Sequence, residues 1–210
     1  MGLLFKKRSG QSGTIAVWQI TGSETAEQLG RELLQHERTA LNALALPEKK
    51  RQWLAVRMLL AELGSSSTLI SYDEQGKPFL QDQKIFISLS HSKDRAAIAL
   101  DQRPTGIDIE YISEKIERVA GKFMSDDELA RLPMHQKREA LYVHWCVKEA
   151  LYKLHGKKKL IFREQLILDP FQYNEKGNVT GNIVHDKKTE RHELRYEKTG
   201  DYMLAYVSYN

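Results

Sequence analysis

Two carboxylates at positions i and i+2 are the first candidates for chemistry: Asp108 and Glu110, in the segment GIDIE at residues 106–110. Their spacing predicts a strand that turns both acids to one side and two isoleucines to the other. Adjacent carboxylates repel unless a cation lies between them, and Mg²⁺ with substrate phosphates is the usual partner. For an isolated Asp-x-Glu pair, the alternative is a solvated strand edge.

A third carboxylate, Glu149, lies in the segment WCVKEALYK at residues 145–153, between Lys148 and Lys153. Helical spacing gives this segment an apolar stripe: Val143, Val147, Leu151 and Leu154. A Trp and a Tyr lie on roughly the opposite face, so we expect a helix buried on two sides, with Glu149 and its lysines facing a site. The alternative is a surface ion pair between Glu149 and Lys153.

Two short segments could contact phosphate groups. Lys77 and Pro78 follow a glycine in a predicted tight turn, and Ser90, His91 and Ser92 follow a predicted strand. Hydroxyls and an imidazole at a strand end can bind phosphate oxygens, and they could also be the nucleophile and base of a hydrolase. The absence of a Gly-x-Ser-x-Gly segment argues against the hydrolase.

A basic cluster precedes these segments and contains Lys49, Arg51 and Arg57. Most such runs form a solvated helix face. Arg57 lies among apolar neighbours, which makes a purely solvated role less fitting for it.

Composition limits the class of protein. The chain has 210 residues, 41% of them apolar, which is enough for a packed core. A net charge of +4 permits attraction to phosphates or an acidic partner but is not by itself a nucleic-acid signature. No apolar run is long enough to cross a membrane, and the single cysteine fits a reducing compartment, so the expected location is cytoplasmic, with no membrane and no nucleic-acid partner.

The elements that must position these residues follow from periodicity and turn signals. We expect a loop at residues 8–13 and a hairpin at 71–78. The remaining expected elements are strands at 15–20, 84–89, 96–100 and 106–111, helices at 23–46, 47–63, 114–123, 126–132 and 136–155, and alternating strands and turns from 166 to the end. The second and last helices should end at Gly64 and Gly156.

A weak internal repeat suggests two related halves. The segment RQWLAVR at residues 51–57 resembles HWCVK at 144–148, and YDEQG at 72–76 resembles YNEKG at 173–177. We therefore expect an α+β protein with two similar halves, residues 1–103 and 104–210, and a ligand site in the cleft between them.

The four segments in this order resemble the 4′-phosphopantetheinyl transferases, in their longer, monomeric type that activates carrier proteins. The match covers residues 47–156. The resemblance implies two halves related by a pseudo-twofold axis, coenzyme A bound between them as substrate, and Mg²⁺ as cofactor, with Mn²⁺ as the alternative. It implies an apo acyl or peptidyl carrier protein, acidic in character, as the partner.

The resemblance also implies roles for individual residues. Asp108, Glu110 and Glu149 would ligate the metal, and Lys153, with Lys148, would hold the phosphates. Ser90 and His91 would contact the 3′-phosphate and pyrophosphate, Lys77 and Pro78 the adenine side, and Lys49, Arg51 or Arg57 the 3′-phosphate. The chain has Lys157–Lys159 where the family often has a second glycine, and these lysines could meet the acidic carrier.

The implied reaction is attack of a carrier serine hydroxyl on the β-phosphate of coenzyme A, with adenosine 3′,5′-bisphosphate leaving. Glu149 is the first candidate for the base that takes the serine proton, and Asp108 or a free water are the others. Two other classes stay open: a Mg²⁺-dependent hydrolase of coenzyme A or a nucleotide, and a non-enzymatic module that binds an acidic helix.

Overall fold

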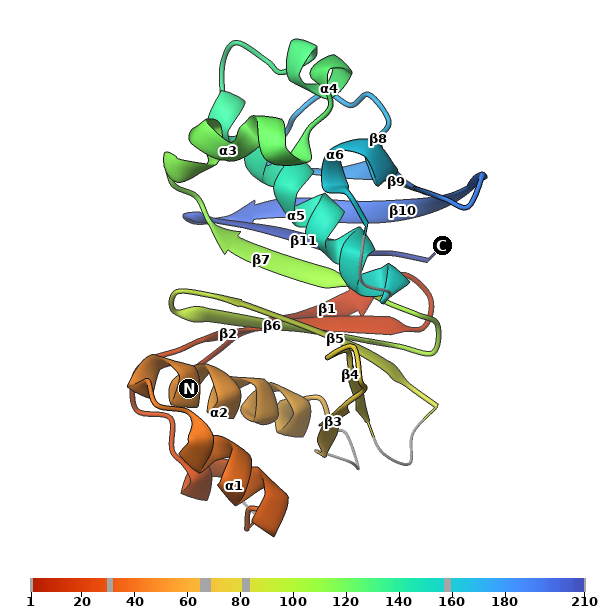
Figure 1. Cartoon of the computed structure of the whole chain (residues 1–210). Coiled ribbons are helices and arrows are strands. Elements are labelled where there is room, and N and C mark those ends of the chain that lie inside the picture. Colours follow the sequence, from red (N-terminus) through yellow and green to blue (C-terminus); the bar gives the residue numbers. More distant parts are fainter. Residues whose placement is uncertain (1, 30–31, 65–68, 81–83, 157–159, 210) are drawn as a thin grey trace.

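The computed structural model describes residues 2–29, 32–64, 69–80, 84–156 and 160–209. They form a mixed α/β structure with two main antiparallel sheets (Figure 1). None of the described helices is both long enough and apolar enough to cross a membrane.

The first sheet has the strand order β1-β2-β6-β5. Its strands are β1 (Leu3–Ser9), β2 (Gly13–Gln19), β5 (Phe86–Ser92) and β6 (Arg95–Asp101). Helix α2 (Pro47–Glu62) covers its outer face, with α1 (Gln35–Ala43), the short 3-10 helix η1 (Ala26–Leu29) and the hairpin of β3 (Ile70–Tyr72) and β4 (Pro78–Leu80) nearby. Leu59 and Leu60 of α2 pack there against Ile87 and Ile98 of the sheet.

The second sheet has the strand order β7-β11-β10-β9-β8. Its strands are β7 (Ile107–Tyr111), β8 (Leu166–Leu168), β9 (Lys176–His185), β10 (Lys188–Thr199) and β11 (Tyr202–Val207). The long helix α5 (Lys137–His155) crosses its outer face, beside α3 (Lys115–Phe123), α4 (Asp126–Ala130) and α6 (Phe162–Gln165). Val147 and Leu151 of α5 are completely buried in this layer.

A third apolar layer lies between the two sheets. It joins Ile15 and Ala97 of the first sheet to Ile109 and Leu204 of the second. The chain is therefore layered as helix, sheet, sheet and helix (Figure 1).

The edge strands β5 and β7 meet through three serine hydroxyls. Ser88, Ser90 and Ser92 alternate along β5, so they point to one side. Their Oγ atoms accept hydrogen bonds from the backbone N–H groups of Ile107, Ile109 and Tyr111 at 3.1, 3.2 and 3.1 Å. The edge N–H groups of β7 are thus satisfied by side chains of the other sheet.

The helix ends follow their sequence signals. Pro47 occupies the first turn of α2, and Gly64 and Gly156 adopt φ values of +68° and +70° just beyond α2 and α5. Ser125 caps α4 by accepting from the N–H of Glu128, whose carboxylate accepts in return from the N–H of Ser125. These predicted boundaries are confirmed.

The strand expected at 84–89 is β5, which runs on to Ser92, so Ser90, His91 and Ser92 lie in the strand and do not follow it. Two other expected elements are wrong. Residues 8–13 are not a loose loop, because β1 continues to Ser9 and pairs with Gly13 across a tight turn. The expected helix over 23–46 is instead η1 and α1 in its described part. Ser23 does not cap a helix, because the nearby carboxylate of Glu24 accepts the N–H groups of Thr21 and Gly22 and holds a turn.

Candidate functional site

A cavity of about 590 Å³ lies between α2, β5, β7 and α5. Residues 44–91 line one side and residues 108–156 the other. Three acids and several cations share it, and these side chains come from segments far apart in the sequence.

Helix α2 contributes one face to the cavity. Lys49, Gln52, Trp53, Val56 and Arg57 line it, at positions i, i+3, i+4, i+7 and i+8. Residues with this spacing share one side of a helix. Arg51 lies off that side and does not line the cavity, so the structure does not support the prediction that it binds the ligand.

Helix α5 forms the opposite wall of the cavity, which is lined by Glu149, Tyr152, Lys153 and the following Gly156. Val147 and Leu151 on the other side of the helix are completely buried. The predicted helix is buried on two sides, and of the predicted group Glu149 and Lys153 line the cavity, whereas Lys148 does not.

Asp108 and Glu110 reach the cavity from β7. The Nζ of Lys153 donates to Oδ1 of Asp108 at 2.8 Å and to the carbonyl of Ile107 at 3.0 Å. Oδ1 also accepts from Ser90 Oγ at 2.7 Å. Oδ2 of Asp108 is buried and has no hydrogen-bond partner among the described residues, so this side offers an open oxygen ligand.

Burial and the neighbouring carboxylates raise the pKa of Glu149 and of Glu110. Burial, followed by repulsion from Asp108 and Glu110, raises the pKa of Glu149 to about 7, although Lys153 opposes the shift. Burial and Asp108 likewise raise the pKa of Glu110. Such carboxylates are stabilised as anions by a cation placed among them.

The cations lie along the rest of the cavity. Lys49 and Lys77 line it together with His91, and burial and the neighbouring Lys49 lower the pKa of His91. Burial also lowers the pKa of Lys77, whose Nζ donates to the carbonyl of Leu154 at 3.1 Å. Pro78 lines the same wall.

Arg57 is only partly directed to the cavity. Its Nε lies 3.3 Å from Oε1 of Glu37, and both side chains are almost fully buried. The guanidinium also stacks at 3.1 Å from the ring centroid of Trp53. Trp53 was missed from the sequence, although its place on the same helix side as Lys49 would have indicated it.

Ser90 lines the cavity but has another partner. A hydroxyl has one proton to donate, and Ser90 donates it to Asp108. Ser92 donates in the same way to Oε2 of Glu110 at 2.7 Å. Both hydroxyls therefore orient carboxylates, a role that the alternating spacing of the serines could have indicated.

Lys148 does not reach the cavity, which contradicts its predicted place on the phosphates. Its side chain is completely buried, and its Nζ lies 2.7 Å from Oε2 of Glu128 and 2.7 Å from the carbonyl of Phe123. Lys148 lies about 100° around the helix from Glu149, and in α5 that direction leads to Phe123, Glu128 and Phe162, not to the cavity. Lys157–Lys159 lie outside the described residues.

The sequence was compared with models of protein families and with individual proteins. The model of the 4′-phosphopantetheinyl transferase superfamily matches residues 104–207. This part of the chain includes β7, α5 and the whole second sheet.

Individual relatives agree. The chain is 41% identical over 86 residues to the 4′-phosphopantetheinyl transferase psf-1 of Bacillus pumilus, covering 39% of the chain and 37% of that protein. It is 32% identical over 96 residues to the 4′-phosphopantetheinyl transferase gsp of Aneurinibacillus migulanus, covering 44% of the chain and 40% of that protein. It is 33% identical over 115 residues to the 4′-phosphopantetheinyl transferase AcpT of Salmonella typhimurium, covering 51% of the chain and 60% of that protein.

In each case the matched part is less than two thirds of the relative's own length. The family model and these relatives nevertheless agree on one assignment. Through residues 104–207, the chain belongs to the 4′-phosphopantetheinyl transferase superfamily.

Proposed function

We propose that this chain transfers the 4′-phosphopantetheine group of coenzyme A to a serine of an apo acyl or peptidyl carrier protein. The observation that supports this most directly is the meeting of Asp108, Glu110 and Glu149 with Lys153 in one cavity. Lys49 and Lys77 add positive charge along the same cavity, as a ligand with several phosphates requires.

We further propose that Asp108, Glu110 and Glu149 hold Mg²⁺, or Mn²⁺ in its place. All three offer oxygen atoms, which hard cations prefer, and Oδ2 of Asp108 is buried without a hydrogen-bond partner among the described residues. When bound, the cation would neutralise charge on the transferring phosphate.

The chain's own residues would do the rest. Lys153 would add positive charge beside the phosphates, and Lys49, Lys77, Pro78, Arg57 and His91 would bind the remainder of coenzyme A. Ser90 and Ser92 would hold the carboxylates at a fixed angle, because each already donates its proton to one of them.

In the proposed reaction, the carrier serine oxygen forms a bond to the β-phosphorus, and the bond from that phosphorus to the bridging oxygen breaks. Adenosine 3′,5′-bisphosphate leaves with the bridging oxygen. Glu149 would accept the serine proton, because its carboxylate lines the cavity beside Asp108, Glu110 and Lys153, where the phosphates would lie. Asp108 and a free water remain the alternatives for this role.

At the level of the chain, we propose halves of residues 1–103 and 104–210 related by a pseudo-twofold axis. Each main sheet has a long helix on its outer face, α2 or α5, which supports this division. Both walls of the cavity come from one chain, which supports a monomer. A single buried cysteine supports a cytoplasmic location.

The test is incubation with coenzyme A, Mg²⁺ and an apo carrier protein, followed by the mass of the carrier. The mass should increase by one phosphopantetheine group. Glu149→Gln should lower the rate about 10²- to 10⁴-fold. Glu139→Gln is the matched control on the same helix, because Glu139 pairs with Lys198 and does not line the cavity.

Absence of the added mass across several carriers would overturn the proposal. Cleavage of coenzyme A without any acceptor would point to the hydrolase instead. Tight binding of an acidic carrier without consumption of coenzyme A would point to a binding module.

A further inference from the structure

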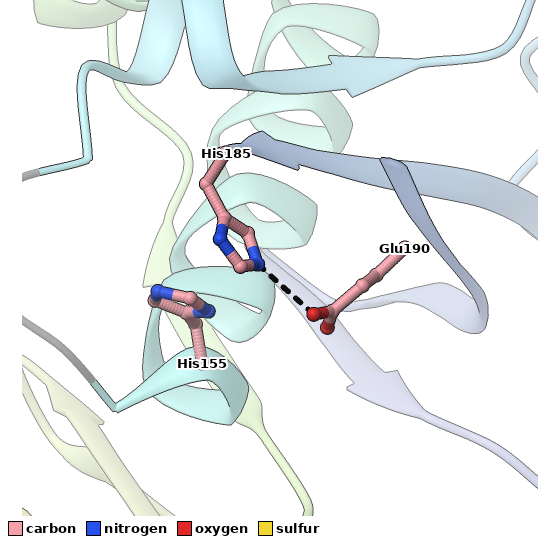
Figure 2. Close-up of side chains that lie close together, drawn as sticks. All are labelled: His155, His185 and Glu190. Carbon is pink, nitrogen blue, oxygen red and sulfur yellow. Dashed lines mark hydrogen bonds and ion pairs between the residues drawn. The ribbon is translucent and has the colours of Figure 1, made fainter. Parts of the chain in front are cut away.

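A second group of metal-ligating side chains lies outside the cavity, where the end of α5 meets the hairpin of β9 and β10. Figure 2 shows His155, His185 and Glu190 pointing toward one another from these three elements. Their ligand atoms all lie within 4.8 Å of one another.

The strand register explains why these residues meet. Across the hairpin, Glu190 pairs with Ile183 and His192 pairs with Gly181. Cross-strand partners share a face, and alternate residues do too, so Glu190, His192 and His185 lie on one side of the sheet.

Helix α5 packs on that same side. A side chain at Gly181 would touch Leu151 of α5, and His155 lies one helical turn beyond Leu151. The fold therefore brings a third imidazole to the sheet face that already holds two.

The contacts within the group are close. Nε2 of His185 lies 2.9 Å from Oε1 of Glu190, and the rings of His155 and His185 have centroids 4.8 Å apart. Nε2 of His192 lies 3.7 Å from Oε2 of Glu190, too far for a hydrogen bond, and this buried nitrogen has no hydrogen-bond partner among the described residues.

The donor set selects a class of metal. Imidazole nitrogens with one carboxylate suit Zn²⁺ and its neighbours in the transition series, whereas Mg²⁺ prefers oxygen ligands alone. His155 also lies in the last turn of α5, where the partial negative charge of the helix end favours a cation. The alternative is a hydrogen-bonded cap over the core, made by His185 and Glu190 alone.

We propose that His155, His185 and Glu190 form a three-ligand site for Zn²⁺, distinct from the carboxylate site in the cavity. His192 would hold the second oxygen of Glu190 and so orient this ligand. Ligand atoms around a tetrahedral zinc lie about 3.3 Å apart. Binding would therefore bring the most distant ligand atoms, up to 4.8 Å apart, closer by up to about 1.5 Å, and would separate Nε2 of His185 from Oε1 of Glu190, now at 2.9 Å, by a few tenths of an ångström. The side chains of His185 and Glu190 are 18% and 49% exposed, which leaves them room to rotate.

The test is titration of chelator-treated protein with Zn²⁺ in a calorimeter, with excess Mg²⁺ present to compete for the all-oxygen site. We expect one Zn²⁺ per chain for the wild type. His155→Gln and Glu190→Gln should each weaken the affinity at least about 10-fold. His135→Gln is the matched control, because His135 is an exposed histidine elsewhere and should leave the affinity unchanged.

A second measurement guards against misfolded variants. Zn²⁺ should raise the unfolding temperature of the wild type and of His135→Gln, and should not raise that of His155→Gln, while circular dichroism confirms that each is folded. No zinc binding by the wild type, or equal binding by the His155→Gln and Glu190→Gln variants, would overturn the site. Neither measurement uses coenzyme A or a carrier, so failure here is separate from failure of the proposed transferase activity.

Discussion

The hydroxyl of Ser90 joins two strands and one carboxylate at the same time. It accepts the N–H of Ile109 and donates to Oδ1 of Asp108. Ser88 accepts the N–H of Ile107 in the same way but makes no hydrogen bond to a carboxylate of the described residues. All three serines of β5 accept an N–H of β7, but only Ser90 and Ser92 also donate to a carboxylate. This difference can be tested.

Replacing Ser88, Ser90 or Ser92 by Ala should lower the free energy of unfolding by about 1 to 3 kcal/mol each, because each leaves an N–H of β7 without its partner. Only Ser90→Ala and Ser92→Ala should also raise the Mg²⁺ concentration needed for half-maximal transfer, since they free Asp108 or Glu110 to rotate. Urea unfolding and a Mg²⁺ titration measure the two effects. An equal Mg²⁺ shift in Ser88→Ala would contradict the positioning role.

Lys148 gives a second prediction at this scale, because its buried ammonium is paired with Glu128 and does not face the cavity. Lys148→Met should cost about 3 to 5 kcal/mol of stability by leaving the Glu128 carboxylate unpaired. The variant should keep its rate per folded molecule, whereas Lys153→Met should lose rate with a smaller effect on stability. Thermal unfolding and initial rates measure both.

Lys122→Met is the control for Lys148, since Lys122 is exposed on α3 and should change neither quantity. A loss of rate in Lys148→Met with unchanged stability would contradict this assignment and favour the place on the phosphates that the family resemblance implied for Lys148.

The raised pKa of Glu149 makes stability depend on pH in the metal-free protein. The pKa rises from 4.5 to about 7 on folding, so the folded state binds the extra proton between these values. The contribution of Glu149 to the free energy of unfolding is therefore greatest below about pH 4.5 and is lost as pH rises toward 7. In chelator-treated protein at pH 8, Glu149→Gln should be more stable than the wild type, by on the order of 2 kcal/mol.

Unfolding of both proteins from pH 5 to pH 8 would measure this difference. The gap between them should close at the acid end. A gap that stays constant across the range would show that Glu149 is not the group that titrates.

At the scale of elements, periodicity predicted the long helices well because each has a continuous buried face. Helix α2 was expected at 47–63 and runs over Pro47–Glu62, and α5 was expected at 136–155 and runs over Lys137–His155. It did not predict β1, where exposed and partly buried residues alternate and three basic residues hide the strand pattern. Nor did it predict the turn held by Glu24, because that turn depends on side-chain bonds to the backbone.

The close approach of β7 and α5 gives the prediction for this scale. A Cβ at Gly106 would overlap the carbonyl oxygen of Ala150, which is backbone and cannot turn aside. Gly106→Ala should push α5 away and cost about 1 to 3 kcal/mol. It should also lower the transfer rate, because Glu149 and Lys153 move with the helix. Urea unfolding and transfer assays measure both.

Gly121→Ala is the matched control. Nothing lies within 4 Å of a Cβ at this position in α3, so Ala should stabilise the helix by about 0.5 to 1 kcal/mol and leave the rate unchanged. If Gly106→Ala behaved like Gly121→Ala, the approach of α5 to β7 would not matter for the site.

At the scale of the whole molecule, the sequence indicated which residues belong to the site better than it indicated how they are held. Lys49, Lys77, His91 and the three acids do share one cavity. The stacking of the two sheets through Ile15, Ala97 and Leu204 depends on contacts between distant segments, which local spacing does not encode. The same is true of the buried pair that takes Lys148 away from the cavity.

The family match covers residues 104–207, yet the first sheet covers the apolar face of β7 and β11 and satisfies the edge of β7. We therefore predict that residues 104–210 expressed alone do not fold to the native state, because Ile107, Ile109 and Leu204 would face water. They should show weak near-ultraviolet circular dichroism. They should also show no calorimetric binding of coenzyme A, because Lys49 and Lys77, which are proposed to bind it, lie in the other half. Co-expression with residues 1–103 should restore both signals. A folded C-terminal half that binds coenzyme A as tightly as the intact chain would show that the first sheet is neither a structural support nor a wall of the site.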